Sequence, residues 1–404
     1  MHLATTTKRI YPKHGWEIVG LPLRRCFIAI LSSCAIVALI DVLWLGWFGP
    51  DKHYDFYGIW SFSRFMQRYP IVEIYNADQL QAFQHAIAPG FTGFYPCPYP
   101  PSFLVSITWL GRFSTGAAKV LWTAVGLLLM AGSCWIFFQP PMRKWALLAT
   151  VLAPASLLNG AVGETGFFST SFLIAGFAWL PKRPVLAGVA FGLLTLKPQL
   201  GVLVPFALLA RGEWRAIIYA AFTALTLIGV SCLVLPLDLW TTWIYTLPQY
   251  QRLVLENQPE LCHLMATIDS ALLCLHAPAS VALAVQVFGS SIIIVTVWCC
   301  FRMATYRLAV AALLAGTALA SPHAFAYDTS FLICALFLAG EWIAERKSHI
   351  STLTLALCLI LYLLPLGLTS ESGVFFIYAV PETLIFFSIA RLALTSSESV
   401  AHNS

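Results

Sequence analysis

A few polar side chains stand out in a chain that is otherwise strongly apolar, and the first of them is Asp55. It lies in the stretch HYDFYGIW, where the flanking aromatic residues would partly exclude water from its carboxylate. Burial of this kind raises a carboxylate pKa towards the range that suits a general base. The alternative is a helix N-cap, in which a short acid binds free backbone N–H groups. We expect Asp55 to be a catalytic carboxylate.

The most unusual cation of the chain is Lys197, which lies between two apolar half-helices and is followed directly by Pro198. A charge at membrane depth is costly and therefore marks a functional site. A cation at a helix break suits a phosphate, because the free N–H groups of the next half-helix add to its attraction. The alternative is that the Lys197 side chain extends to the membrane interface.

Two glycine- or proline-containing turns carry further polar residues. Glu164 lies in NGAVGETG and is either an exposed acid in a tight hairpin or a ligand of a polar headgroup. His323 and Asp328 lie in SPHAFAYD, where we expect His323 to donate to a phosphate or sugar oxygen and Asp328 to cap the following helix. Two ligands are too few for a metal site, and we expect neither a metal nor a cofactor.

The composition indicates what holds these residues in place. Of the 404 residues, 59% are hydrophobic and 10% are charged, whereas soluble proteins have about 25% charged residues. This indicates a polytopic membrane protein with no nucleic-acid partner, because the basic residues fall in short clusters between apolar runs. No polar block is long enough for a separate soluble domain.

We therefore expect an all-α fold of about 12 transmembrane helices. A cytoplasmic tail (1–24) would precede a single membrane domain (25–394), and a second cytoplasmic tail (395–404) would follow it. The expected spans are 25–48, 115–138, 145–160, 166–180, 185–196, 199–210, 216–235, 279–299, 308–320, 329–344, 350–368 and 375–392.

The longest polar interval, 49–101, would be a catalytic extracytoplasmic loop. Within it, the apolar residues from Phe62 to Tyr69 recur at helical spacing, which is typical of an interfacial helix lying on the membrane surface. A second short helix is expected over 76–87. The run 102–113 is too short to span the bilayer and would be re-entrant or interfacial.

The basic clusters predict the orientation. If 102–113 does not cross the membrane, all of these clusters fall on the side of the N-terminal tail, which is cytoplasmic by the positive-inside rule. The clusters are Arg143 with Lys144, Lys182 with Arg183, Arg211 with Arg215, Arg302 with Arg307, Arg346 with Lys347, and Arg391. Both termini would then be cytoplasmic, and every candidate site residue would lie on the outer face of the membrane. Cys97 would lie in the 49–101 loop and Cys262 in a second outer loop over 236–262, and whether they pair is open.

Five stretches together resemble a known family: DFYGIW, YPPSFL, NGAVGETGF, LAGVAFGLLTLKPQLGVLVPFALLARGEWRA and SPHAFAYD. In this order they are similar to the bacterial polyprenyl-phosphate-sugar-dependent transferases of glycosyltransferase family 87, in the GT-C class, whose known members include mannosyltransferases. The resemblance implies a multi-pass protein of a bacterial plasma membrane. The resemblance implies that Asp55 is the essential acid and that Lys197 and His323 lie around the donor phosphate. Relatives usually have Gly-Gln-Asn where this chain has Gly163, Glu164 and Thr165, which bears on sugar or acceptor choice.

Further residues would contact the substrates. Aromatic side chains of the 49–101 loop would provide platforms for sugar and isoprenoid, unless they form an ordinary interfacial belt. The full expected substrate-binding set is Tyr54, Tyr57, Trp60, Tyr99, Glu164, Gln199 and Asp328.

The expected function is transfer of a hexose, with mannose first, from a polyprenyl-phosphate donor to a lipid or glycan acceptor. The reaction would occur on the extracytoplasmic face, next to membrane lipid, with inversion and with Asp55 as general base. The main alternative is a secondary transporter or a lipid or polyprenyl flippase that uses Lys197 and Asp55 as coupled charges. A non-catalytic scaffold and a polymerase or ligase of surface glycans are further alternatives.

Overall fold

The protein is entirely helical over the part of the chain that the structure describes. This computed structural model describes residues 55–257, apart from 89, 92 and 141, together with 265–345 and 378–401. These ranges contain sixteen α-helices and no β-sheet, only an isolated bridge between Met265 and Phe325. The expected spans 25–48 and 350–368, the tail 1–24 and Tyr54 lie outside the described residues.

Three helices are long and apolar enough to cross a membrane: α5 (Thr115–Phe137), α11 (Trp214–Val234) and α14 (Ala279–Met303). Their apolar side chains point outwards, since only 6% of the most hydrophobic window of α11 is buried. Large exposed apolar surfaces of this kind are stable in lipid rather than in water. The described part of the chain is therefore that of a membrane protein, and all three helices coincide with expected spans.

Most of the remaining expected spans correspond to helices that are shorter than full crossings; the exception is 375–392, which falls largely in the 23-residue helix α18 (Ala379–Ala401). Helices α6 (Arg143–Val151) and α7 (Pro154–Val162) meet at a bend of 46° and form a fourth span if they are counted together. Pro154 accounts for the break, because proline cannot continue the hydrogen bonding of the preceding turn. The other expected spans coincide with short apolar helices, so the expectation of about twelve complete crossings is not confirmed; these helices are α8 (Gly166–Trp179), α9 (Pro184–Leu193), α10 (Val204–Arg211), α15 (Tyr306–Ala320) and α16 (Ser330–Glu345).

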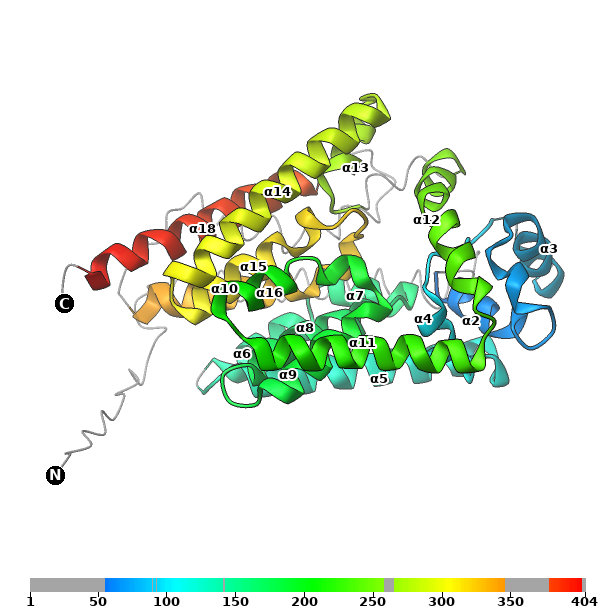
Figure 1. The fold of residues 1–404 in the computed structure, drawn as a ribbon, viewed down its shortest axis with the longest axis horizontal. Helices are drawn as coiled ribbons and strands as arrows, with labels where there is room; N and C mark the ends of the chain where they lie inside the picture. Colours follow the sequence, from blue (N-terminus) through cyan, green and yellow to red (C-terminus); the bar gives the residue numbers. More distant parts are fainter. Residues whose placement is uncertain are drawn as a thin grey trace.

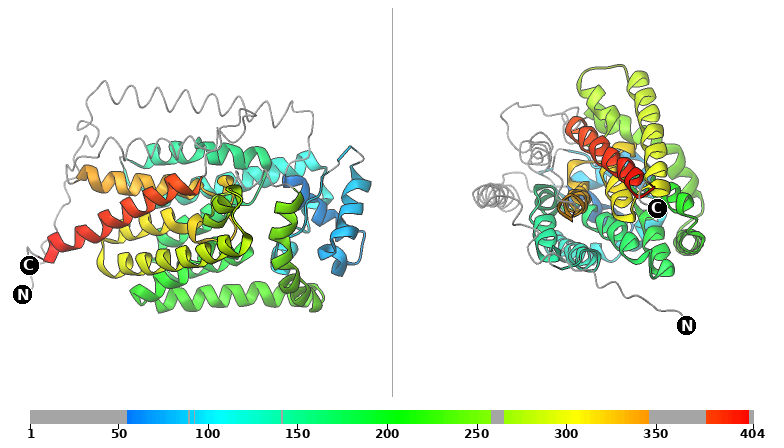
Figure 2. Two further views of the ribbon diagram at one scale, coloured as in Figure 1. Left: turned by 90° about the horizontal axis from the view of Figure 1, so that it is seen from above. Right: turned by 90° about the vertical axis from the view of Figure 1, so that its left-hand side faces the viewer.

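Helix α15 forms the centre of one half of the bundle. It packs against α14, α16 and α18 (Ala379–Ala401), which surround it in both views (Figures 1 and 2). Every residue from Leu308 to Ala320 is buried, as expected for a helix that is hydrophobic on all sides. Helix α18 continues to Ala401, past the expected end of the membrane domain at 394.

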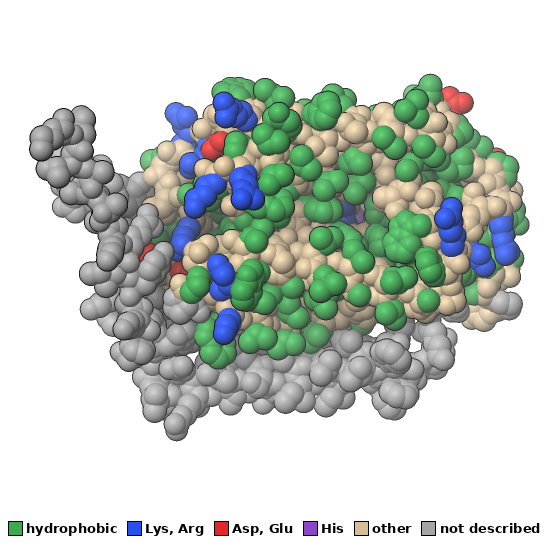
Figure 3. All heavy atoms as spheres, turned by 90° about the horizontal axis from the view of Figure 1, so that it is seen from below, with side chains coloured by type: hydrophobic (Ala, Val, Ile, Leu, Met, Phe, Trp, Pro, Cys, Tyr) green, Lys and Arg blue, Asp and Glu red, His purple; other side chains and the backbone are tan. Residues whose placement is uncertain are grey.

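Basic side chains gather at one end of the bundle, which we call the Lys/Arg end, and a smaller group of them lies at the opposite end (Figure 3). The Lys/Arg end is where α6, α9, α11 and α15 begin (Figure 1), and the residues at or just before these helix starts are Arg143, Lys144, Lys182, Arg183, Arg211, Arg215, Arg302 and Arg307. Contacts join several of its helices: Arg302 Nη1 donates to Ala210 O (3.2 Å), and the Arg211 guanidinium lies 5.1 Å from the Tyr306 ring centroid. The expected clustering is therefore found for these residues. Arg346 and Lys347 lie outside the described residues.

The opposite end, which we call the distal end, carries the four helices α2 (Asp55–Phe65), α3 (Ala77–Ile87), α4 (Pro101–Ile107) and α12 (Asp238–Asn257) (Figure 1). Helix α4 has seven residues, about 10 Å of rise, which is too short to cross a bilayer and agrees with the expectation that 102–113 does not span. The expected second short helix is α3, with Asn76 as its N-cap.

Two expectations for the distal end were wrong. Helix α2 ends at Phe65 and is buried on almost all sides, instead of lying on the membrane with one apolar face. Its aromatic residues pack together with α3, α4 and the segment 94–99 in a second hydrophobic cluster, which we call the distal-end cluster. The expected loop 236–262 contains the 20-residue helix α12.

Candidate functional site

Most of the expected site residues line a single cavity of about 270 Å³, which we call the main cavity. Its walls come from the start of α2, the segment 94–99, the turn after α7, the break around residue 197, α12, and the loop 323–327. These elements are far apart in the sequence, and the fold brings them together. The lining contains Asp55, Tyr99, Glu164, Lys197, Gln199 and His323.

Asp55 is the first residue of α2, so its carboxylate lies next to the free N–H groups of a helix start. It also accepts a hydrogen bond from the Tyr327 hydroxyl. Burial, and then the nearby charge of Glu164, raise the pKa of Asp55 from 3.8 to about 7. The expected N-terminal position and the expected desolvation therefore both hold for the same residue. A carboxyl group with this pKa can take up a proton near neutral pH.

Glu164 reaches the cavity from a turn that only glycine can form easily. Gly163 ends α7 with φ +77°, and a Cβ on it would lie 2.6 Å from Phe56 Cβ of α2. The turn therefore packs directly on the helix that starts with Asp55. Glu164 Oε2 accepts hydrogen bonds from the Tyr99 hydroxyl (2.8 Å) and from the Thr165 backbone N–H (2.9 Å). The acid is buried and held, rather than exposed on a hairpin.

Lys197 forms a buried ion pair with Asp328. Its Nζ lies 2.6 Å from Asp328 Oδ1, and the two side chains are 8% and 0% exposed. Lys197 sits between two short 3₁₀ helices, Leu194–Leu196 and Pro198–Gly201, where Pro198 interrupts the chain of backbone hydrogen bonds. The chain break that was expected from the sequence is therefore present, and the cation is not at an exposed interface.

The role expected for Asp328 is corrected. Instead of capping α16, its second oxygen accepts the Phe325 backbone N–H (3.2 Å) within its own 3₁₀ turn, Ala326–Asp328. Burial raises the pKa of Asp328, while the Lys197 ammonium opposes this rise. Asp328 thus holds Lys197 in place and partly neutralises it.

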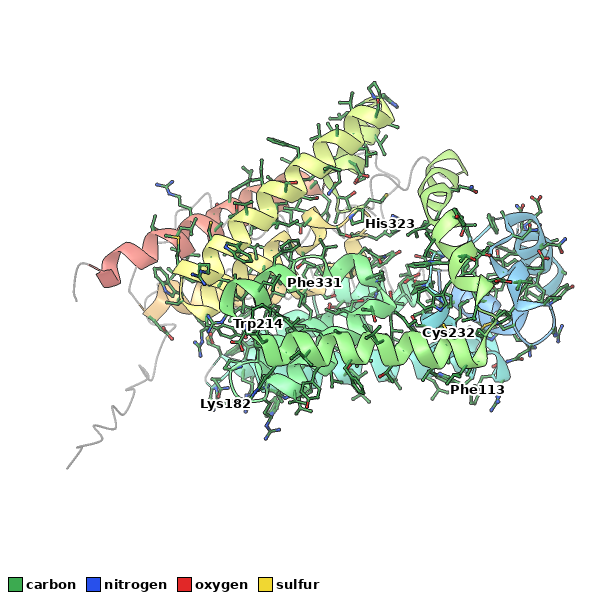
Figure 4. The ribbon with its side chains drawn as sticks, viewed as in Figure 1. Phe113, Lys182, Trp214, Cys232, His323 and Phe331 are labelled. Carbon is green, nitrogen blue, oxygen red and sulfur yellow. The ribbon has the colours of Figure 1, made fainter. Side chains whose placement is uncertain are left out.

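His323 lies in the interior, displaced along the molecule from Lys182 of the Lys/Arg end (Figure 4). Its ring makes edge contacts with Tyr250 (5.5 Å between centroids) and Phe325 (5.0 Å). Its Nδ1 is buried and has no hydrogen-bond partner among the residues that the structure describes. Burial and the Lys197 charge lower the pKa of His323 to about 3. His323 is therefore neutral at pH 7, and it would meet a phosphate as a hydrogen-bond donor rather than as a cation.

Two expected aromatic residues lie away from the main cavity. The Tyr57 hydroxyl donates to Gln84 O (2.7 Å), and Trp60 Nε1 donates to Phe113 O (3.0 Å). Both side chains are buried in the distal-end cluster and hold α2 against its neighbours. Cys97 is a free thiol, so it does not pair with Cys262, whereas Cys274 is disulfide-bonded.

Three site residues were missed from the sequence. Tyr250 of α12 and Tyr327 both line the main cavity, and Lys119 of α5 donates to Ala161 O (2.5 Å) and interacts electrostatically with Asp55. Tyr327 stands next to Asp328 in SPHAFAYD, which could have indicated it. Tyr250 and Lys119 had no such signal, because Tyr250 lies in the expected loop 236–262 and Lys119 lies near the start of the expected span 115–138.

The cavity can bind polar groups of opposite character. One part offers two neighbouring acids, Asp55 and Glu164, and another offers the Lys197 ammonium beside the neutral His323. Among the described residues, no three His, Cys, Asp or Glu side chains come together as a metal site would require. This arrangement can accept a proton at one point and hold an anionic oxygen at another.

Comparison with known proteins now bears on this site. The family model of glycosyltransferase family 87 matches residues 98–322, more than half of the chain. Neither the curated proteins nor the solved structures gave a match. The matched range contains Tyr99, Glu164, Lys197 and Gln199 and ends one residue before His323. The chain therefore belongs to glycosyltransferase family 87.

Proposed function

We propose that this protein transfers a hexose, with mannose as the first candidate, from a polyprenyl-phosphate donor to a lipid or glycan acceptor. The observation that carries the proposal is the pairing, in one cavity, of a carboxyl group with a pKa near 7 and a buried ammonium. Transfer of a glycosyl group needs a base at one side of the anomeric carbon and stabilisation of a departing phosphate at the other.

Asp55 is the general base in this proposal. Its carboxylate takes the proton of the acceptor hydroxyl as the acceptor oxygen forms its bond to the anomeric carbon. Because a base near its own pKa combines availability with a sufficient drive for proton transfer, a pKa of about 7 suits this step. A single displacement of this kind inverts the anomeric configuration.

Lys197 receives the leaving group. The bond between the anomeric carbon and the phosphate oxygen breaks as the new bond forms, and the electron pair stays on the polyprenyl phosphate. The Lys197 ammonium stabilises the developing charge, and the neutral His323 ring donates a hydrogen bond to the same phosphate. Asp328 keeps the ammonium in position through the 2.6 Å contact.

Two observations favour the extracytoplasmic face. The main cavity is lined in part by α2, α12 and the segment 94–99 of the distal end, whereas the larger group of basic side chains lies at the Lys/Arg end (Figure 3). An excess of basic residues marks the cytoplasmic side of membrane proteins. The disulfide at Cys274 belongs to an oxidising compartment outside the cytoplasm. A donor anchored in the outer leaflet by its isoprenoid would then reach the site without leaving the bilayer.

A transporter or flippase remains the second candidate, because the buried Lys197–Asp328 pair could serve as a coupled charge. The carboxyl group of Asp55 supports transfer instead, since it lines the main cavity together with Lys197 but is not part of the Lys197–Asp328 ion pair. A charge-coupled carrier does not need a separate base there.

The test is transfer of radiolabelled sugar from synthetic polyprenyl-phosphate-mannose in membranes that contain the wild type, Asp55→Asn or Asp238→Asn. Asp238 is the matched control, because it is also the first residue of a helix but is exposed. We expect Asp55→Asn to lose at least about 100-fold in rate, and Asp238→Asn to lose little.

Two results would overturn the proposal. Full activity of Asp55→Asn would leave only the helix-cap role for this residue. Absence of transfer by the wild type from mannosyl, glucosyl and galactosyl donors, together with polyprenyl-phosphate-sugar movement across vesicles, would favour the flippase.

A further inference from the structure

A second cavity lies beside the main one at the distal end. Its volume is about 260 Å³, and its walls come from α12, the 3₁₀ helix Ile71–Tyr75, the start of α3 and the segment 94–98. The two cavities share Phe94, Pro96, Pro98 and Tyr250 in their walls. A ligand in the second cavity would therefore lie next to a ligand that is bound beside Asp55 in the main cavity.

The lining of this second cavity is uncharged. Among the described residues around it there is no Lys, Arg, His, Asp or Glu, whereas Asn76, Thr246 and Gln249 add neutral polar groups. Aromatic rings of Tyr75, Phe94, Trp243 and Tyr250 complete the walls. A phosphate would find no cation here, so the chemistry excludes the charged end of the donor.

The position of this cavity argues against the donor's isoprenoid as its occupant. Its walls belong to α3, α12 and the loops between them, at the distal end of the bundle where the long helix α11 ends (Figure 1). An isoprenoid would need an apolar groove along the membrane-spanning helices. Flat aromatic rings with amide and hydroxyl groups instead suit a sugar, whose C–H faces pack on rings and whose hydroxyl groups bond to amides.

Two groups are free to make such contacts. The Gln249 side chain is exposed, and neither its amide nor the Tyr250 hydroxyl makes a hydrogen bond to another described residue. By contrast, the Trp243 and Tyr75 polar atoms are used within the fold: Trp243 Nε1 donates to Pro98 O (2.9 Å) and the Tyr75 hydroxyl to Tyr99 O (2.7 Å). These two bonds fix the rings and keep the cavity open.

We infer that the second cavity is an acceptor subsite that binds a neutral saccharide, so that the acceptor is a glycan which already carries sugar. This inference rests on the proposed function for its catalytic meaning. A hydroxyl of the terminal sugar of this glycan would pass Tyr250 and reach Asp55, while the preceding sugar would occupy the second cavity. Tyr250, in the shared wall, would contact both.

The test fills the second cavity from its edge. Ala77 lines it at the first turn of α3, and Ala77→Trp would place an indole inside it. Gln79→Trp is the control on the same turn, because Gln79 is exposed and lies outside the lining. Equal melting temperatures and equal yields in detergent establish that both variants fold, and Gln249→Ala provides a second, milder variant.

Binding is measured without any donor, by saturation-transfer NMR of the purified protein with neutral manno-, gluco- and galacto-oligosaccharides and with farnesyl phosphate. We expect at least one neutral oligosaccharide to bind the wild type and Gln79→Trp but not Ala77→Trp. Absence of oligosaccharide binding to the wild type, unchanged binding in Ala77→Trp, or loss of farnesyl phosphate binding alone would each overturn the inference.

Activity separates this inference from the proposed function. With a polyprenyl-phosphate-hexose donor, Ala77→Trp should raise the KM for the oligosaccharide at least about tenfold, while Gln249→Ala raises it by a smaller factor. Release of the hexose to water should stay unchanged. If the wild type transfers no sugar but binds a saccharide, and Ala77→Trp does not bind it, the proposed reaction fails and the saccharide site stands.

Discussion

The pKa of Asp55 gives the most direct quantitative prediction. Burial and the Glu164 charge raise it from 3.8 to about 7, which corresponds to about 4 kcal/mol in favour of the protonated acid. Because only the ionised form accepts a proton, kcat/KM should fall about tenfold per pH unit below pH 7. The measurement is the rate of label transfer between pH 4.5 and 9 at a donor concentration below KM.

The perturbation that tests this account is Glu164→Gln, which keeps the size of the side chain and removes its charge. Burial is the larger cause of the raised pKa and Glu164 the second, so most of the shift should remain. We expect the acid limb of the profile to move down by about one pH unit, or about 1.4 kcal/mol. Glu345→Gln, at an exposed position near the Lys/Arg end, should leave the profile unchanged.

Two results would refute the reasoning. A wild-type midpoint near pH 4 would mean that Asp55 is well solvated and that burial does not tune it. An unchanged midpoint in Glu164→Gln, with folding intact, would mean that the two carboxylates do not interact across the main cavity.

Three further predictions concern stability and positioning. Because the pKa of Asp55 is raised, its contribution to stability is present below about pH 4 and is lost as the pH rises to 7. Asp55→Asn should therefore raise the apparent melting temperature in detergent at pH 8 and change it little at pH 4. The opposite order would contradict the burial of this acid. Lys197→Met should leave Asp328 buried without its partner and lower the free energy of unfolding by about 3–5 kcal/mol. Adding Asp328→Asn to this variant should recover much of the melting temperature but no transfer activity. Recovery of activity would show that Lys197 serves stability alone. Gly163→Ala should lower both activity and melting temperature, because a Cβ there would lie 2.6 Å from Phe56 of α2. Gly212→Ala is the control: its φ of +68° is similar, and its Cβ would make only an ordinary contact with Trp214 at 3.9 Å, so only the backbone cost of about 1 kcal/mol applies. Equal effects of the two variants on activity would separate the Gly163 turn from the site.

The sequence predicted most of the long helices and six of the residues that line the main cavity. Apolar runs near the length of a bilayer predicted α5, α11 and α14, because the hydrophobic thickness of a membrane fixes the length of a span. Lys197 could be found because a cation between two apolar half-helices is costly anywhere else. Asp55, Glu164 and His323 were found for the same reason: each is a rare polar residue near the end of an apolar or aromatic run.

Only the tertiary structure decided how these residues act on one another. Residues 197 and 328 lie far apart in the sequence, and no local pattern indicates that Asp328 would pair with Lys197 instead of capping α16. Tyr57, Trp60 and Tyr99 all pack in the distal-end cluster, yet only Tyr99, which lies in the segment before α4, also lines the main cavity. Tyr57 and Trp60 do not reach it, because α2 turns Asp55, Gly58, Ile59 and Phe62 towards the cavity instead. Ionisation followed the same rule, because the pKa values of Asp55 and His323 depend on burial and on neighbouring charges, which exist only once distant segments have packed together.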